Sequence, residues 1–280
     1  MQKADYEPIV AAALAEDLAD AGDVTSDATI PSGVQAQGDL VVRQPGVVAG
    51  LEVAAHVFDV VDPVIEFRSG AADGDRVDIG SVVGIVSGPA RSILTAERTA
   101  LNLLARMSGV ATATAELVAA VDGTAARISD TRKTMPGLRV LDKYAVTAGG
   151  GVNHRMGLHD AVMIKDNHLV AGLGIIDAVS AARERVGPSF QITVEVENLN
   201  QLRTVLVTDA DRVLLDNMNL EMLREAVEIV GGKVVTEASG GITLDNVREI
   251  AETGVDVISV GWITHSAPQL DIALDFRSDH

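Results

Sequence analysis

The second half of the chain alternates short apolar runs with helical patterns. The apolar runs lie near residues 128, 162, 192, 213, 234 and 257, and patterns such as IIDAVSAARERV and NLEMLREAVEIV fill the gaps between them. This regular spacing predicts strands that alternate with helices, and therefore a parallel sheet that closes into a barrel. Fewer strands are visible than a complete eight-stranded barrel requires. We therefore expect an open, incomplete α/β barrel.

The first half has a different pattern. Residues 5–20 predict a helix, and residues 36–86 contain short β-type runs that Gly, Pro and Asp separate, with the helical insert AAHVFDVVD between them. This indicates an α+β region with mostly antiparallel strands. A long helical pattern follows over residues 91–121, and we expect a break near Ser108 and Gly109. With 280 residues, the chain is long enough for two domains with cores of their own.

One cation lies on an apolar face of the long helical pattern. Leu94, Arg98, Leu101 and Ala105 share this face. Either the Arg98 side chain reaches past the apolar surface to solvent, or the face packs on another surface and contributes Arg98 to a site there.

Charge is distributed unevenly along the chain. The formal net charge of −18 makes nucleic acid and anionic membranes poor partners. Residues 130–168, which we call the cationic segment, nevertheless contain six Lys or Arg residues against four Asp. The segment is either a solvated basic face or a local site for small anions. The chain has no cysteine, and its acidic N-terminus resembles neither a signal peptide nor a membrane span, so we expect a soluble cytoplasmic protein.

The apolar runs of the second half end at polar residues whose character changes along the chain. In a parallel barrel the carboxyl ends of the strands share one face, so these residues would converge on one pocket. Cations come first, carboxylates follow, and small residues come last: Thr131, Arg132 and Lys133; Lys165 and Asp166; Glu195 and Glu197; Asp216; Ser239, Gly240 and Gly241; and Ser259 to Gly261. Such a pocket suits an anionic substrate beside a phosphorylated, metal-bound one.

Each group has a functional and a structural interpretation. The glycines after the last strands either expose backbone N–H groups to a phosphate at a helix N-terminus or simply form tight turns. Glu195 and Asp216 either hold Mg²⁺ and stabilise positive charge, or form salt bridges. The spacing of His154, His159 and His168 fits no usual zinc pattern, so we expect hydrogen bonding to an anion instead. Arginines can grip carboxylates with two hydrogen bonds, whereas lysines act as point charges.

At these residues the sequence resembles the quinolinate phosphoribosyltransferase family, also called nicotinate-nucleotide diphosphorylase (carboxylating). The blocks that carry the resemblance are ISDTRKTMPGLRVLDKYAV, GGGVNHRMGLHDAVMIKDNH, VEVEN, LLDNM, EASGGI and VDVISVG, in the family's order. The resemblance covers nearly the whole chain. It implies an N-terminal α/β sandwich domain, taken as residues 1–110, and an open α/β barrel domain, taken as residues 111–268. The tail, residues 269–280, would pack back on the first domain.

The resemblance also implies a pentosyltransferase reaction. Quinolinate and 5-phosphoribosyl 1-diphosphate would give nicotinate mononucleotide, diphosphate and CO₂ with Mg²⁺, in a homodimer whose sites take residues from both subunits. Carried over by position, Arg98 would enter the partner's site, and Lys133, Lys165, Glu195 and Asp216 would be catalytic. The binding residues would be Arg98, Thr131, Arg132, Lys133, His154, Arg155, Lys165, Glu195, Asp216, Ser239, Gly240, Gly241 and Gly261.

The sequence departs from the family pattern at two positions, where Thr147 replaces a common Arg and Met135 replaces a small polar residue. Neither position belongs to the implied site. Three other functions compete: a paralogue associated with molybdenum transport, a phosphoribosyltransferase for nicotinate, and a non-catalytic phosphometabolite-binding protein. Nicotinate lacks the second carboxylate and needs fewer cations, and a non-catalytic protein would have lost Glu195, Asp216 or Lys133.

Overall fold

The computed structural model describes residues 1–277, which form two compact units. The first unit contains Met1–Ala115, Thr134–Gly150 and the C-terminal segment from Ile263, and the second contains Glu116–Lys133 and Gly151–Trp262. The units are thus discontinuous in sequence, because residues 134–150 from within the expected barrel domain pack with the first unit. Residues 278–280 of the expected tail lie outside the described residues.

A four-stranded antiparallel sheet organises the first unit. Its strand order is β12 (Ile272–Phe276), β1 (Gln35–Val42), β5 (Val82–Pro89) and β3 (Glu66–Ser69). The C-terminal strand therefore adds an edge to the sheet of the N-terminal strands. Two short strands, β2 (Gly46–Val47) and β4 (Arg76–Val77), form a separate antiparallel pair. The antiparallel α+β pattern predicted for the first half is confirmed.

Four shorter helices accompany this sheet: α1 (Lys3–Leu18), α2 (Val24–Thr29), α3 (Leu51–Val61) and α5 (Arg139–Ala148). The predicted N-terminal helix and the helical insert correspond to α1 and α3. Helix α2 was not expected, and Asp23 explains why it forms. The Asp23 carboxylate accepts hydrogen bonds from the backbone N–H groups of Thr25 and Ser26, which an unfavourably short helix needs at its start.

The long helix α4 (Ala90–Ala120) has no break, so the interruption expected at Ser108 and Gly109 is wrong. Gly109 serves close packing instead, because a Cβ atom there would lie 2.0 Å from the carbonyl oxygen of Pro268. Within residues 1–277, α4 is the one helix long and apolar enough to cross a membrane, and 67% of its most apolar window is buried inside the protein. It is therefore a core helix by burial.

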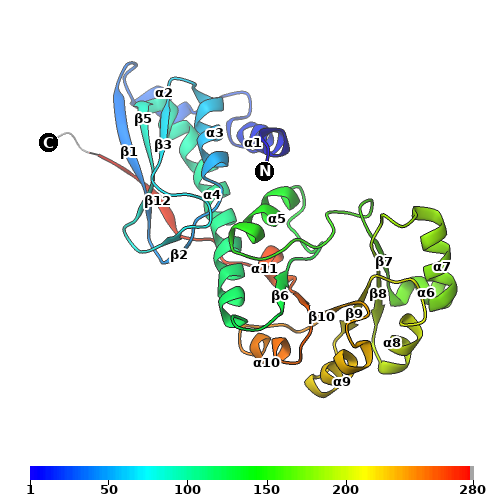
Figure 1. Cartoon of the computed structure of the whole chain (residues 1–280). Coiled ribbons are helices and arrows are strands. Elements are labelled where there is room, and N and C mark those ends of the chain that lie inside the picture. Colours follow the sequence, from blue (N-terminus) through cyan, green and yellow to red (C-terminus); the bar gives the residue numbers. More distant parts are fainter. Residues whose placement is uncertain (278–280) are drawn as a thin grey trace. The chain divides into compact units, whose positions relative to one another are not determined.

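Six parallel strands form the sheet of the second unit (Figure 1). In sheet order they are β6 (Arg127–Ser129), β11 (Val257–Ser259), β10 (Val235–Ser239), β9 (Arg212–Asp216), β8 (Ile192–Val196) and β7 (Val162–Ile164). The first strand pairs with the last, as in a barrel, but no ladder joins β6 to β7 within residues 1–277. An isolated bridge between Ser129 and Val152 lies at that opening. The predicted open α/β barrel is confirmed.

Helices connect the barrel strands on their outer side (Figure 1). They are α6 (Asp166–Ala171), α7 (Ile175–Val186), α8 (Leu199–Val205), α9 (Leu220–Val230) and α10 (Val247–Ala251). The short helix α11 (Trp262–His265) follows the last barrel strand, β11, and leads toward β12. Helices α8 and α9 are capped by the residues before them, Asn198 and Asn219, whose side chains accept hydrogen bonds from backbone N–H groups of the first turn. Strand β8 is buried along most of its length, as expected for a strand that a helix covers on one side and a barrel interior on the other.

Candidate active site

Register between the barrel strands brings the polar residues of four strands together. Glu195, Leu214 and Glu237 are paired across β8, β9 and β10. Asp216, Ser239 and Ser259 form the next row, two residues further along β9, β10 and β11. Residues paired across a parallel sheet point to the same face, so both rows face the barrel interior. These six side chains line one cavity.

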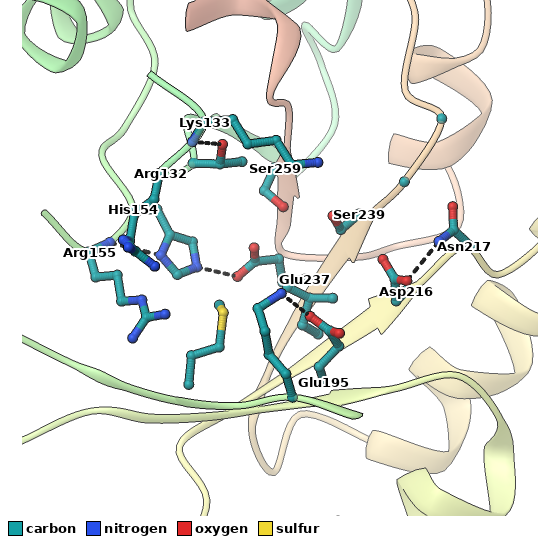
Figure 2. A pocket seen from close by; sticks show the side chains of 16 residues that line it. Arg132, Lys133, His154, Arg155, Glu195, Asp216, Asn217, Glu237, Ser239 and Ser259 are labelled. Carbon is teal, nitrogen blue, oxygen red and sulfur yellow. Dashed lines mark hydrogen bonds and ion pairs between the residues drawn. The ribbon is translucent and has the colours of Figure 1, made fainter. Parts of the chain in front are cut away.

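The cavity has a volume of about 620 Å³ and lies within the second unit. This volume is in the usual range for a pocket that encloses a small molecule. Its lining residues come from the barrel strands and the loops after them (Figure 2). They are Thr131, Arg132, Lys133, His154, Arg155, Met163, Lys165, Glu195, Leu214, Asp216, Asn217, Glu237, Ser239, Gly240, Gly241 and Ser259.

Two arginines make one side of the cavity electropositive. Burial lowers the pKa of Arg155, and the neighbouring Arg132 guanidinium lowers it further, while Asp160 opposes both effects. The Arg155 guanidinium nevertheless keeps its positive charge at physiological pH. Arg155 Nη1 donates to the carbonyl oxygen of Ala161 at 3.0 Å, which fixes the side chain. An anion between the two arginines would relieve their repulsion, so this side of the cavity favours carboxylate or phosphate.

His154 lies deeper, with a side chain that is 8% exposed. Its backbone N–H donates to Oδ1 of the buried Asp130 at 2.8 Å. Nδ1 of the imidazole accepts from the backbone N–H of Arg155 at 2.8 Å, and Nε2 lies 3.2 Å from Glu237 Oε2. Both ring nitrogens are therefore occupied by protein groups.

Lys165 and Glu195 form an ion pair on the opposite side of the cavity. Lys165 Nζ lies 2.6 Å from Glu195 Oε2, and the two side chains are 43% and 11% exposed. The salt bridge that was the structural alternative for Glu195 is thus present, and the Glu195 carboxylate lines the cavity as well. Glu197, which we considered beside it, is exposed beyond the end of β8.

Asp216 ends β9 and is held by the residue after it. Asn217 Nδ2 donates to Asp216 Oδ2 at 2.7 Å, and Asn217 adopts a φ of 52° that few residues other than glycine take. Gly240 lies against this amide, since a Cβ on Gly240 would be 2.1 Å from Asn217 Oδ1. Only glycine fits at position 240.

The loop with Gly240 and Gly241, which we expected to bind phosphate at a helix N-terminus, differs from that expectation in one respect. Gly240 and Gly241 both have positive φ values, 99° and 62°, and line the cavity directly after β10. Helix α10 does not begin until Val247, so no helix N-terminus adjoins the glycine pair. Backbone N–H groups in such consecutive unusual conformations can nonetheless form an anion-binding concavity.

Most residues predicted for the site line this cavity, and two do not. Gly261 precedes α11 and is outside the cavity lining, although it makes interactions of its own. Arg98 belongs to the first unit, where its side chain is 66% exposed and borders a separate cavity of about 270 Å³ with Leu101 and Ala105. His159 and His168 are also absent from the lining, and His168 Nδ1 instead accepts from the backbone of Lys165.

Four lining residues were not predicted from the sequence, namely Met163, Leu214, Asn217 and Glu237. Ser259, which ends one of the apolar runs, lines the cavity as expected for the strand ends. Period-two alternation along β10 could have identified Glu237, because it lies two residues before Ser239 and so shares its face. Nothing in the sequence singles out Met163 or Leu214 from other apolar strand residues.

A magnesium ion fits the chemistry of the carboxylates with help from a substrate. Glu195 is engaged by Lys165, and Asp216 has one oxygen in a hydrogen bond with Asn217. Within residues 1–277 no three acidic or histidine side chains cluster around a point that could hold a metal. Mg²⁺ usually keeps several waters and takes one or two carboxylates together with substrate phosphates, which this arrangement permits.

Two family descriptions match the chain in sequence. Residues 23–108 match "Quinolinate phosphoribosyl transferase, N-terminal domain", and residues 110–275 match "Quinolinate phosphoribosyl transferase, C-terminal domain". Together they cover most of both units.

Individual relatives are similar over nearly the whole chain. A nicotinate-nucleotide pyrophosphorylase (carboxylating) from Mycobacterium leprae (strain TN) is 47% identical over 268 residues, which cover 94% of each protein. A relative from Oryza sativa subsp. japonica with the same name and the addition "chloroplastic" is 42% identical and covers 98% of this chain and 78% of that protein. The solved nicotinate-nucleotide pyrophosphorylase from Francisella tularensis is 38% identical, with a TM-score of 0.95 and coverage of 99% and 98%. The chain therefore belongs to the quinolinate phosphoribosyltransferase family.

Proposed function

We propose that this protein transfers the phosphoribosyl group of 5-phosphoribosyl 1-diphosphate to quinolinate. The products are nicotinate mononucleotide, diphosphate and CO₂, and the reaction is the pentosyl transfer of de novo NAD biosynthesis. The observation that carries the proposal is the division of one cavity into a side with paired guanidiniums and a side with carboxylates and a glycine pair. A dicarboxylate and a phosphorylated sugar need these two environments next to each other.

Quinolinate binds on the cationic side. Arg132 and Arg155 take the two carboxylates, and Lys133 adds a third positive charge. Met163 and Leu214 provide apolar contact for the pyridine ring, which polar groups alone would leave poorly packed.

The phosphorylated sugar binds on the other side. Gly240 and Gly241 offer backbone N–H groups to the 5′-phosphate, together with the Ser239 hydroxyl. Glu195 and Asp216 face the ribose. Glu195 and Asp216 would hold a bound Mg²⁺, directly or through water, and the ion would supply positive charge against the diphosphate.

The transfer begins with breakage of the bond between ribose C1 and the diphosphate oxygen. Positive charge develops at C1, and the carboxylates of Glu195 and Asp216 stabilise it electrostatically. The pyridine nitrogen attacks C1 from the opposite face, so no side chain forms a covalent bond. The bond between the ring carbon and the departing carboxylate then breaks and CO₂ leaves. The electron pair stays on the ring carbon, where the adjacent quaternary nitrogen stabilises the negative charge, and this carbon takes up a proton. Lys133 and Lys165 balance the charge of the leaving diphosphate.

The proposed assembly is a homodimer in the cytoplasm, with Arg98 entering the site of the partner subunit. Arg98 is the cation among the implied site residues that does not line the barrel cavity, and its exposed side chain on α4 suits a contact outside its own unit. Because the net negative charge of the protein repels anions, an additional arginine from the partner subunit would help to bind anionic substrates.

A turnover assay with Mg²⁺ tests the function. Quinolinate and nicotinate are offered separately with phosphoribosyl diphosphate, and nicotinate mononucleotide and CO₂ are measured. We expect product and CO₂ from quinolinate alone.

The substitution Lys133→Ala should reduce turnover at least about a hundredfold, because a charged transition-state contact is lost. The matched control is Lys233→Ala, which removes an exposed lysine between α9 and β10 and should leave turnover unchanged. Turnover of nicotinate alone, or normal turnover by the Lys133 variant, would contradict the proposal.

A further inference from the structure

A buried carboxylate lies beneath the cationic side of the cavity, and the reaction above does not use it. Glu237 has no exposed surface. Its Oε2 atom takes two contacts, from His154 Nε2 at 3.2 Å and from Arg212 Nη1 at 3.0 Å (Figure 2 shows the first). Burying an ionised carboxylate is costly unless strong partners compensate, so a residue that keeps one in a barrel interior calls for an explanation.

The hydrogen bonds around His154 fix where its ring proton lies. A backbone N–H can only donate, so Nδ1, which accepts from the Arg155 N–H, carries no proton. The neutral ring must then be protonated at Nε2, which points to Glu237. His154 thus bridges two groups: its Nε2 donates to the Glu237 carboxylate, and its Nδ1 accepts from the backbone N–H of Arg155.

Glu237 is ionised in this arrangement. Burial by itself disfavours the charged form, but the Arg212 guanidinium, whose Nη1 donates to Glu237 Oε2 at 3.0 Å, and the His154 Nε2 at 3.2 Å stabilise the carboxylate. An ionised acceptor makes the hydrogen bond from His154 stronger than a bond between neutral groups.

We propose that Glu237 is a positioning residue that acts through His154 on Arg155. The carboxylate holds the His154 ring in one orientation, and Nδ1 of that ring holds the Arg155 backbone, so the guanidinium projects toward the substrate carboxylates. His154 then serves quinolinate binding indirectly rather than as a hydrogen-bond donor to the substrate. This role rests on the proposed function, because it assigns Arg155 to quinolinate.

The test is a double-mutant cycle on the steady-state constants for both substrates. Glu237→Gln keeps the side-chain size but weakens the acceptor, and His154→Asn keeps an acceptor near Nδ1 but loses the contact with Glu237. We expect each change to raise KM for quinolinate roughly tenfold, with little change in KM for phosphoribosyl diphosphate. The combined variant should be no worse than the worse single one, since both act on one chain of contacts.

Other outcomes would overturn the role. Additive effects, or equal rises in KM for both substrates, would mean that Glu237 is merely structural. Combining Glu237→Gln with Asn217→Gly is the control, because Asn217 contacts Asp216 and Ser239 instead, and the two effects should add.

A second readout does not depend on turnover. In protein labelled with ¹⁵N-histidine, the His154 signals, assigned through the His154→Asn variant, should show a neutral ring with the proton on Nε2, and quinolinate should not change this. A doubly protonated ring, or a proton on Nδ1, would overturn the inference even in an active enzyme. An enzyme inactive on quinolinate with the expected ring signals would instead contradict the proposed function alone.

Discussion

Asn217 combines an unusual backbone conformation with two contacts in the site. Its φ is 52°, its amide donates to Asp216, and its backbone N–H donates to the carbonyl oxygen of Ser239 at 2.9 Å. The amide also covers Gly240. A residue other than glycine is less stable at such a positive φ, and the surrounding contacts must offset this loss of stability. We interpret Asn217 as the residue that fixes the Asp216 carboxylate against the glycine pair.

Substitutions at this position separate the side chain from the backbone. Asn217→Gly allows the positive φ but removes the amide, so we expect kcat to fall about tenfold with unfolding stability nearly unchanged, because one hydrogen bond to a charged group is lost. Asn217→Ala should show the same loss of activity and an added destabilisation of about 1 kcal/mol from the strained backbone. Steady-state kinetics and urea unfolding measure the two effects. Wild-type kinetics in the glycine variant would exclude a role for the amide.

The sequence pattern predicts some residues of this site but not others, and the difference has a physical reason. Cations and glycines after strands were recognisable because their chemistry is unusual at those places. Glu237 follows the same alternation as Ser239, but a carboxylate in mid-strand is ambiguous without knowledge of its partners, and Arg212 and His154 are remote in sequence. Asn217 reads as an ordinary turn residue, and only its φ and its contact with Gly240 distinguish it.

At the scale of the elements, the spacing of apolar residues predicted the strands and helices of the barrel. It did not predict that α4 continues without a break through Gly109. Gly109 was interpreted as a helix break because glycine is a poor helix former. In the folded protein it permits backbone contact with Pro268, a residue 159 positions later in the chain. Local propensity cannot report a contact of that range. The same applies to α2, where a side-chain cap stabilises a helix of six residues.

The sign of the change in unfolding free energy on Gly109→Ala tests the packing role of this glycine. Replacing a helical glycine with alanine usually stabilises a protein by up to about 1 kcal/mol. Here the added Cβ would meet the Pro268 carbonyl oxygen at 2.0 Å and a backbone atom of Gln269 at 2.9 Å, so Gly109→Ala must displace backbone. We expect it to destabilise the protein by about 1–3 kcal/mol in urea unfolding. In the control Gly174→Ala, at φ −65°, the added Cβ meets no atom within 4 Å, so any loss should be smaller and reflect only the place of Gly174 as the N-cap of α7. A stabilising Gly109 variant would refute the packing role.

At the scale of the whole molecule, positive charge is gathered where anions must bind. The chain has a formal net charge of −18, yet four of the six cations of the cationic segment line the barrel cavity: Arg132, Lys133, Arg155 and Lys165. Arg139 and Lys143 belong to the first unit, where Lys143 is fully buried. The segment is therefore not a solvated basic face. Four of its cations line the barrel cavity, Lys143 is buried in the first unit, and Arg139 is half-buried there.

Arg98 tests whether the complete site needs a second subunit. Arg98→Ala and Lys133→Ala should each be nearly inactive alone, because each removes a cation from every site. After the two variants are mixed and allowed to exchange subunits, half of the dimers are hybrids, and in each hybrid one site carries both substitutions while the other carries neither. Activity should then recover to about a quarter of the wild-type value, as expected for twofold-symmetric dimers with shared sites. If Arg98 served its own subunit's site, every site in the hybrids would keep one defect. The mixture would then stay inactive, provided that sedimentation and exchange of a tagged subunit show that hybrid dimers have formed.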